Sequence, residues 1–263
     1  MLRRIAPALI LPALTVGILV GIRSIGEDTD GRVTAGGPAA PSAARPAVVP
    51  DLSSTSTCNQ PNALIGTAAA DRVVARAEPD PGAEVIASFG RRTKQGGPQV
   101  FLLENRVQLP ENGAWFKALL PIRPNSTRGY IRTDSLRLSQ TPYRIEVNRK
   151  ALSLTLWRGC RKVETYPIGL GTKYTPTPVG EFYLASLIKP TNPDSVYGSF
   201  AYGLSGYSPV IKNWKWGGII GIHGTNDPSS VGKRISHGCI RMRNRHIAAL
   251  VKILPLGTPV EIR

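Results

Sequence analysis

The sequence has few of the large residues that build helical cores. Among its 263 residues are two methionines and five phenylalanines, against 27 glycines and 23 prolines. Glycine and proline interrupt helices and favour turns, so this composition argues against a mainly helical fold. The hydrophobic content of 41% is still sufficient for real cores. We therefore predict a mainly β protein with short strands, in one large domain or two modest ones.

Charged residues are absent between Ile5 and Ile22, a stretch that follows Arg3 and Arg4. As a helix it would be about 27 Å long, which nearly spans a bilayer. We predict that residues 1–25 form a signal anchor or a cleaved signal peptide. No clean cleavage site follows directly, which favours the anchor. The remaining chain would then lie outside the cytoplasm, in the cell envelope.

Large apolar residues are also rare from residue 26 to residue 62, where glycine, alanine, proline, serine and threonine dominate. Such a segment has almost nothing to bury, so we predict a flexible linker with a mean span of about 35 Å. An anchored domain could then work at some distance from the membrane.

Cysteine is scarce as well, and the three cysteines are an odd number. An oxidising compartment favours disulfides, so one cysteine is left over. We predict that Cys58 pairs with Cys160 and that Cys239 keeps a free thiol. The alternative is three unpaired cysteines.

Acidic residues are outnumbered, with 17 against 33 basic residues and a net charge of +16. A positive surface attracts polyanions. Outside the cytoplasm these would be anionic wall polymers or lipid headgroups, and export excludes nucleic acid as a partner. The alternative is an ordinary solvated basic surface without a partner.

Two runs of short strands follow the linker. The first covers residues 63–140, with strand patterns at 72–77, 99–103, 114–119 and 128–132. It resembles a small bacterial Src-homology-3-like barrel. The resemblance implies a module that binds wall peptides or proline-rich segments, or one that acts as a structural spacer.

The second run covers residues 141–263. An aromatic segment from residue 189 to residue 218 lies within it, and we interpret this segment as a mobile lid over a cleft or as a loop with inward-packed aromatics. Further along, Asn244 is predicted to cap a helix over residues 245–254. A final strand is expected at 259–263.

Two histidines lie near a cysteine in this second run. Residues 236–242 read Ser-His-Gly-Cys-Ile-Arg-Met, and His223-Gly224 precedes them. A thiol with a pKa of about 8.5 needs a base or a cation to act as a nucleophile at neutral pH. We assign Cys239 as nucleophile and His223 as its base, because His237 is two residues from Cys239 and would point away from it. The carbonyl of Gly224 can orient the imidazole.

The backbone N–H groups of Gly238 and Cys239 are predicted to bind the oxyanion of an acyl-transfer reaction, within a turn shaped by Ser236 and His237. Arg241 would bind a substrate carboxylate or hold the turn to the protein. The other candidate substrate-binding residues are Tyr202, Trp214 and Asn226.

We expect no metal and no other cofactor. A metal site built from His223, His237 and Cys239 would have two ligands one residue apart, no fourth partner and no acidic second shell.

These residues resemble the catalytic motif of the L,D-transpeptidases of bacterial cell walls. The family motif is a His-Gly pair, a spacer, and Ser/Thr-His-Gly-Cys followed by a hydrophobic residue and Asn or Arg, here 223–224 and 236–241. The resemblance covers about 141–263 and implies a β-sandwich with a short helix after the catalytic turn. It further implies that Cys239 attacks the third residue of a peptidoglycan tetrapeptide stem, expels D-alanine and passes the acyl group to an amine of another stem. Acylation of Cys239 by carbapenems is expected on the same ground.

Two other functions remain open at this point. Water could replace the amine, which would make an L,D-carboxypeptidase that trims stems. The chain could also be a wall-binding protein without catalysis, acting through residues 63–140.

Overall fold

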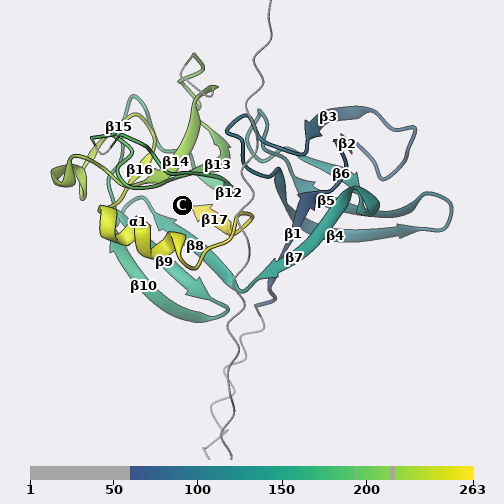
Figure 1. The fold of residues 1–263 in the computed structure, drawn as a ribbon, viewed down its shortest axis with the longest axis horizontal. Coiled ribbons are helices and arrows are strands. Elements are labelled where there is room, and N and C mark those ends of the chain that lie inside the picture. The colour runs from purple at the N-terminus through teal and green to yellow at the C-terminus, as the bar shows by residue number, and fades with distance from the viewer. Residues whose placement is uncertain (1–59, 193, 214–216) are drawn as a thin grey trace, which may run out of the picture. The chain divides into compact units, whose positions relative to one another are not determined.

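The structure is a computed structural model that describes residues 60–192, 194–213 and 217–263 (Figure 1). The predicted signal or anchor over 1–25 and nearly all of the linker over 26–62 lie outside the described residues. Within the described ranges, no helix is both long enough and apolar enough to cross a membrane. The described residues belong to one compact unit.

The first run of strands forms a seven-stranded antiparallel sheet, which we call the N-terminal sheet. Its order is β3-β2-β6-β5-β4-β1-β7. The strands are β1 (Ala63–Ala68), β2 (Arg72–Arg76), β3 (Val85–Gly90), β4 (Val100–Leu109), β5 (Gly113–Leu119), β6 (Arg128–Arg132) and β7 (Leu136–Thr141), with the short helix η1 (Thr133–Ser135) before β7.

Buried aromatic residues explain why this sheet forms a core of its own. Trp115 and Phe116 on β5 are both buried, and the indole N–H of Trp115 donates to the Asn112 carbonyl at 2.8 Å. Phe101 on β4 packs edge-on against Phe89, with ring centroids 5.0 Å apart. Large aromatic side chains contribute much of the apolar area in such small cores. The Src-homology-3-like assignment of residues 63–140 stays a prediction.

The second run forms an eight-stranded sheet, which we call the catalytic sheet, with the order β10-β9-β8-β17-β12-β13-β14-β16. Its strands are β8 (Tyr143–Asn148), β9 (Ser153–Arg158), β10 (Arg161–Pro167), β12 (Gly180–Ile188), β13 (Ala201–Tyr207), β14 (Ile219–His223), β16 (Ile240–Arg241) and β17 (Pro259–Ile262). A separate parallel pair consists of β11 (Leu170–Gly171) and β15 (Arg234–Ser236). The prediction of a mainly β fold is confirmed.

One short helix covers a face of the catalytic sheet, as expected. Helix α1 (Asn244–Val251) lies beside the catalytic sheet (Figure 1). Its residues Ile247 and Leu250 are completely buried in the core of this sheet. The helix ends three residues before the predicted end at Leu254. Its N-cap is Arg243, which makes no side-chain capping bond. The prediction that Asn244 caps the helix is therefore wrong, and the Asn244 side chain has another role that is described with the site.

The two cysteines that the structure describes are in the states that the sequence predicted. Cys160 is disulfide-bonded and Cys239 is free. Cys58 lies outside the described residues, so its pairing with Cys160 stays a prediction. Thiol titration of the denatured, unreduced protein should find one reactive thiol per chain, and three would contradict the pairing.

The two sheets share a small apolar core where β4 meets β12. Val100 and Leu119 from the N-terminal sheet pack with Tyr183 and Ala185 from the catalytic sheet. The hydroxyl of the fully buried Tyr183 donates to the Val100 carbonyl at 3.0 Å. A buried polar contact of this kind fixes the position of one sheet against the other.

Replacing Tyr183 with phenylalanine should weaken this joint without leaving a large void. The variant loses one hydrogen bond and leaves the Val100 carbonyl buried without that donor, so we expect a loss of about 1–2 kcal/mol in the free energy of unfolding. Urea denaturation of both proteins measures the difference. Tyr143→Phe, at a half-buried tyrosine packed beside the catalytic core, is the matched control. Equal losses in the two variants would contradict a specific role for the Tyr183 hydroxyl.

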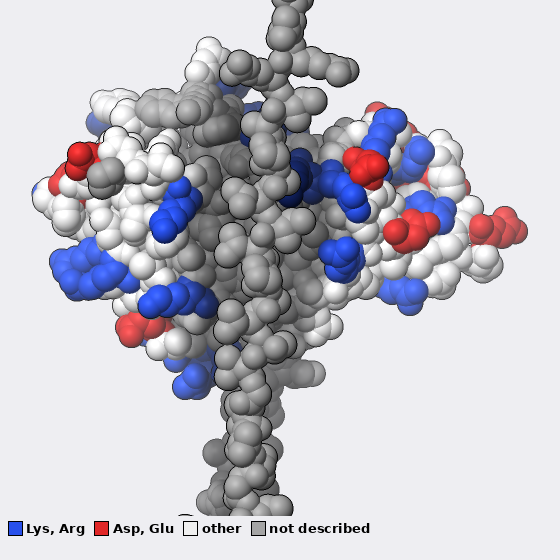
Figure 2. All heavy atoms as spheres, viewed as in Figure 1, with Lys and Arg blue, Asp and Glu red and all other residues white. Residues whose placement is uncertain are grey.

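Basic side chains are spread over the visible face of the molecule. Figure 2 shows Lys and Arg over both sheets, with Asp and Glu among them. The visible surface therefore presents no single basic patch, and attraction to anionic wall polymers stays a prediction that rests on net charge.

Candidate active site

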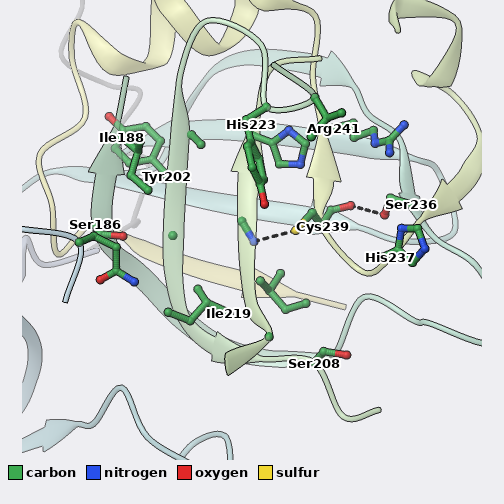
Figure 3. Close-up of a pocket in the computed structure, with 18 of the residues that line it drawn as sticks. Ser186, Ile188, Tyr202, Ser208, Ile219, His223, Ser236, His237, Cys239 and Arg241 are labelled. Atoms are coloured by element: carbon green, nitrogen blue, oxygen red, sulfur yellow. Dashed lines mark hydrogen bonds between the residues drawn. The ribbon is translucent and has the colours of Figure 1, made fainter. Parts of the chain in front are cut away.

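Three neighbouring strands, β13, β14 and β16, contribute residues to a cavity of about 480 Å³ (Figure 3). Ligand sites commonly have this volume. Cys239, His223, His237 and Arg241 all line the cavity. β14 and β16 pair in parallel with His223 opposite Arg241, so Cys239, just before β16, lies beside His223.

Cys239 is half-buried, and its sulfur accepts a hydrogen bond from the backbone N–H of Gly221 at 3.4 Å. A Cβ at Gly221 would lie 3.9 Å from this sulfur and 3.7 Å from Cδ2 of His223. The two side chains therefore converge over a residue without a side chain. Burial raises the pKa of the Cys239 thiol, while the Gly221 N–H and the charge of Arg241 act in the opposite direction.

His223 is 4% exposed, and its Nδ1 lies 2.5 Å from the Gly224 carbonyl oxygen. A carbonyl only accepts, so Nδ1 carries the proton in the neutral ring and Nε2 keeps a lone pair. Tyr197 packs edge-on against the imidazole, with centroids 5.1 Å apart. Burial lowers the pKa of His223 to about 4, with a smaller contribution from Arg241 and opposition from the Gly224 hydrogen bond.

The resting pair at neutral pH is therefore a thiol and a neutral imidazole. A preformed thiolate would need a raised His pKa and a lowered Cys pKa, and both are displaced the other way. The arrangement suits proton transfer to Nε2 during attack. Asp227, the nearest acidic residue in sequence, does not orient His223, because its carboxylate accepts from Ser229 instead.

The turn that carries Cys239 is closed by Ser236. The hydroxyl of this buried residue donates to the Cys239 carbonyl at 2.6 Å and accepts from the Gly238 N–H at 3.1 Å. The Gly238 N–H, which we predicted to bind an oxyanion, is thus used within the turn. Gly238 has φ +112°, a conformation that favours glycine. Its role in this structure is to shape the turn, which leaves the Cys239 N–H as the predicted oxyanion donor.

Two threonines that sequence analysis missed hold the turn from the other side. Thr175 Oγ1 donates to the Ser236 carbonyl at 3.0 Å, and Thr177 Oγ1 donates to the Gly238 carbonyl at 2.8 Å. Thr177 in turn accepts from the Gly171 N–H at 3.0 Å. Both threonines come from a Thr-Pro-Thr-Pro stretch that reads only as a stiff turn. A hydrogen bond between a threonine side chain and a backbone carbonyl 61 residues away leaves no local pattern in the sequence.

Asn244 supports the histidine rather than the helix. Its Oδ1 accepts from the Thr225 N–H at 2.9 Å and from the Ser199 N–H at 3.3 Å. A Cβ at Gly224 would lie 2.1 Å from the same oxygen, so only glycine fits there. The Asn244 amide therefore holds the peptide N–H directly after the carbonyl that binds His223, together with the neighbouring segment at Ser199.

Replacing Asn244 with alanine should reduce both stability and activity. Two backbone donors lose their acceptor, which we expect to cost about 2 kcal/mol of unfolding free energy. The reactivity of Cys239 towards a substrate should fall about tenfold because the Gly224 carbonyl is less well held. Urea denaturation and kcat/KM measure the two effects. Asn244→Asp keeps an acceptor oxygen and should retain most of the stability and most of the activity. An alanine variant with the stability and kcat/KM of the original protein would contradict this role.

Arg241 has an unsatisfied polar group. It lines the cavity, and its Nε is buried without a hydrogen-bond partner in the described part of the chain. Among the described residues that line the cavity, it is the sole member of the group lysine, arginine, aspartate and glutamate. A guanidinium beside a cavity can bind a carboxylate. Both predicted roles, carboxylate binding and holding the turn to the protein, stay predictions.

The structure separates the other predicted residues. His237 is exposed at the cavity rim, on the side of Cys239 away from His223 (Figure 3). Tyr202 belongs to strand β13 and to the hydrophobic core, and its hydroxyl donates to the Leu254 carbonyl at 2.9 Å. Asn226 is absent from the described cavity lining, and its amide donates to the Asp194 carbonyl at 3.1 Å. Tyr202 nevertheless lines the cavity, so substrate contact by Tyr202, like that by Asn226, stays a prediction, and Trp214 lies outside the described residues.

Comparison with known proteins identifies the second half of the chain. Residues 142–262 match the family model of the L,D-transpeptidase catalytic domain. The chain is 41% identical over 151 residues to the Bacillus subtilis protein named "Putative L,D-transpeptidase YkuD", a match that covers 55% of this chain and 84% of that protein. The chain belongs to the L,D-transpeptidase family. The Bacillus licheniformis protein of the same name is 42% identical over 121 residues, covering 46% of this chain and 66% of that protein.

Solved L,D-transpeptidases are also similar to this chain at a low level. An L,D-transpeptidase from Mycobacterium smegmatis gives a TM-score of 0.38 at 14% identity, covering 57% of this chain and 90% of that chain. The L,D-transpeptidase LdtMt1, solved in complex with imipenem, gives a TM-score of 0.39 at 16% identity, covering 61% of this chain and 98% of that chain. Scores of this size carry no detailed comparison. The family assignment rests on the sequence match, which includes Cys239 and His223.

Proposed function

We propose that this protein is a peptidoglycan L,D-transpeptidase that works through a Cys239 thioester. The observation that carries the proposal is the convergence of Cys239 and His223 in one cavity, with Nδ1 of His223 held by the Gly224 carbonyl. This hydrogen bond directs the basic Nε2 away from the backbone. The family and the envelope location expected for a wall enzyme agree with it.

The first step forms the thioester. The Cys239 sulfur attacks the carbonyl of the third stem residue while its proton passes to Nε2 of His223. The tetrahedral intermediate collapses with cleavage of the bond to D-alanine, whose amine leaves with the proton from His223. The Cys239 N–H would bind the oxyanion, a contact of the kind that contributes about 3 kcal/mol to the transition state.

The second step transfers the acyl group. An amine on another stem attacks the thioester and gives its proton to His223, the carbon–sulfur bond breaks, and the proton returns to the sulfur. The Arg241 guanidinium, which lines the cavity, would hold a stem carboxylate during both steps. We also propose that carbapenems acylate Cys239, because their strained carbonyl is an acyl donor for the same thiol.

Incubation with defined tetrapeptide stems tests the proposal. Intact-protein mass spectrometry should show an adduct equal to the stem without D-alanine, and product analysis should show stem dimers linked between their third residues. Tripeptides without dimers would instead support the carboxypeptidase alternative. If neither an adduct nor a product forms, the proposal is contradicted and the wall-binding alternative remains.

A further inference from the structure

One loop of the N-terminal sheet reaches the active-site cavity. Gln95 lies between β3 and β4, more than a hundred residues before the catalytic turn, yet it lines the same cavity as His223 and Cys239. It is half-buried, and its side-chain amide has no hydrogen-bond partner among the described residues. The cavity wall is therefore shared between the two sheets.

A rigid turn presents Gln95 at its tip. The Gly96 N–H donates to the Thr93 carbonyl, and the Thr93 N–H donates to the Gly97 carbonyl, both at 2.9 Å. Arg92 Nη1 also donates to the Gly96 carbonyl at 2.5 Å. Gly96 has φ +87°, which favours glycine at the residue after Gln95. The turn thus holds its tip by backbone bonds that do not depend on the Gln95 side chain.

The edge of the cavity is tied to the same sheet by a second loop. Arg123 donates to the carbonyls of Ser208 at 2.8 Å, Ile211 at 3.2 Å and Gly217 at 3.0 Å. Asn125 exchanges two hydrogen bonds with the backbone of Tyr207, each at 2.9 Å. Ser208 and Ile211 line the cavity. Together with the apolar joint around Tyr183, these contacts fix the position of the N-terminal sheet against the cavity.

We propose that Gln95 is a specificity-determining residue that hydrogen-bonds a peptide group of the bound stem. A carboxamide has one accepting and one donating group and so matches a peptide unit, which also presents one of each. The stem is a peptide, and an amide that lines its cavity and has no partner in the described part of the chain is placed to hydrogen-bond it. The N-terminal sheet then forms part of the substrate site. This inference rests on the proposed function for the identity of the ligand.

The test compares Gln95→Ala with Lys94→Ala. Lys94 lies in the same turn but is exposed and absent from the described cavity lining, so it controls for disturbance of the turn. Loss of one neutral hydrogen bond predicts a three- to tenfold lower kcat/KM for the tetrapeptide stem in Gln95→Ala. Lys94→Ala should stay within twofold of the original protein. Alkylation of Cys239 by iodoacetamide should be unchanged in both variants, since it needs no contact with Gln95.

A binding measurement keeps the test independent of turnover. The tetrapeptide should protect Cys239 from iodoacetamide, and Gln95→Ala should need three to ten times more peptide for the same protection. Three outcomes would each overturn the inference. The first is an unchanged protection curve and kcat/KM in Gln95→Ala, the second is equal losses in both variants, and the third is no protection of the original protein. Protection that depends on Gln95 without any turnover would instead contradict only the proposed transpeptidase activity. Equal Tm values show that the variants are folded.

Discussion

Replacing Cys239 with alanine is expected to abolish stem turnover, by at least about 10³-fold in kcat/KM. The sulfur is the single free thiol in the described part of the chain, and it lies against the Gly221 N–H beside a buried base. No other described nucleophile of comparable reactivity lines the cavity, which otherwise offers serine hydroxyls such as those of Ser186 and Ser208. The measurement is dimer formation from tetrapeptide stems, together with the intact mass of the protein.

The control for this experiment is Ser236→Ala. Ser236 holds the turn through the Cys239 carbonyl and the Gly238 N–H, but in the proposed mechanism it never bonds to the substrate. We expect partial activity and a normal acyl adduct on the Ser236 variant, and no adduct on the Cys239 variant. An adduct that persists in Cys239→Ala would show that another residue is the nucleophile.

Local patterns in the sequence were sufficient to predict part of this site. The pairing of β14 with β16 brings His223 beside Cys239 as expected, because both motifs end or begin short buried strands. The side of β13 that faces the cavity could not be read from the sequence of this strand. Five of the seven residues of β13 are buried, so the alternation that normally separates a cavity side from a core side is absent.

The contacts that position the site come from distant segments. Asn244 binds Ser199 and Thr225 across 45 and 19 residues, and Thr177 binds Gly238 across 61. Each is a single side chain that meets a backbone group, which requires no repeating pattern around either residue. Helix periodicity near Asn244 predicted a cap because Asn is a common cap residue. Tertiary contact with the chain around Gly224 took precedence over that local preference.

The stability of the protein should depend on pH through His223. The unfolded chain binds a proton near pH 6.5, whereas the folded chain resists it until about pH 4. Between these values the unfolded state holds more protons, so the free energy of unfolding falls as the pH drops from 6.5 to 4. Below pH 4 the loss that comes from His223 is complete. The difference corresponds to about 3 kcal/mol. Urea denaturation between pH 4 and pH 8 measures it.

His223→Asn should remove most of this pH dependence, because asparagine can still donate to the Gly224 carbonyl but does not titrate. His237→Asn, at the exposed rim of the same cavity, should leave it in place. An unchanged pH profile in His223→Asn would contradict the assignment of the buried, neutral histidine.

The same pKa sets the acid limit of catalysis. A neutral His223 is the proposed base, so kcat/KM should remain high as the pH falls through 6.5 and decline only near pH 4. On the alkaline side, the raised thiol pKa predicts that iodoacetamide alkylation of Cys239 keeps increasing above pH 9. A preformed ion pair would behave in the opposite way, with fast alkylation at neutral pH and an acid limit set by the thiol. An acid limb near pH 6.5 would therefore contradict the neutral pair, and the two profiles together decide whether the proton moves before or during attack.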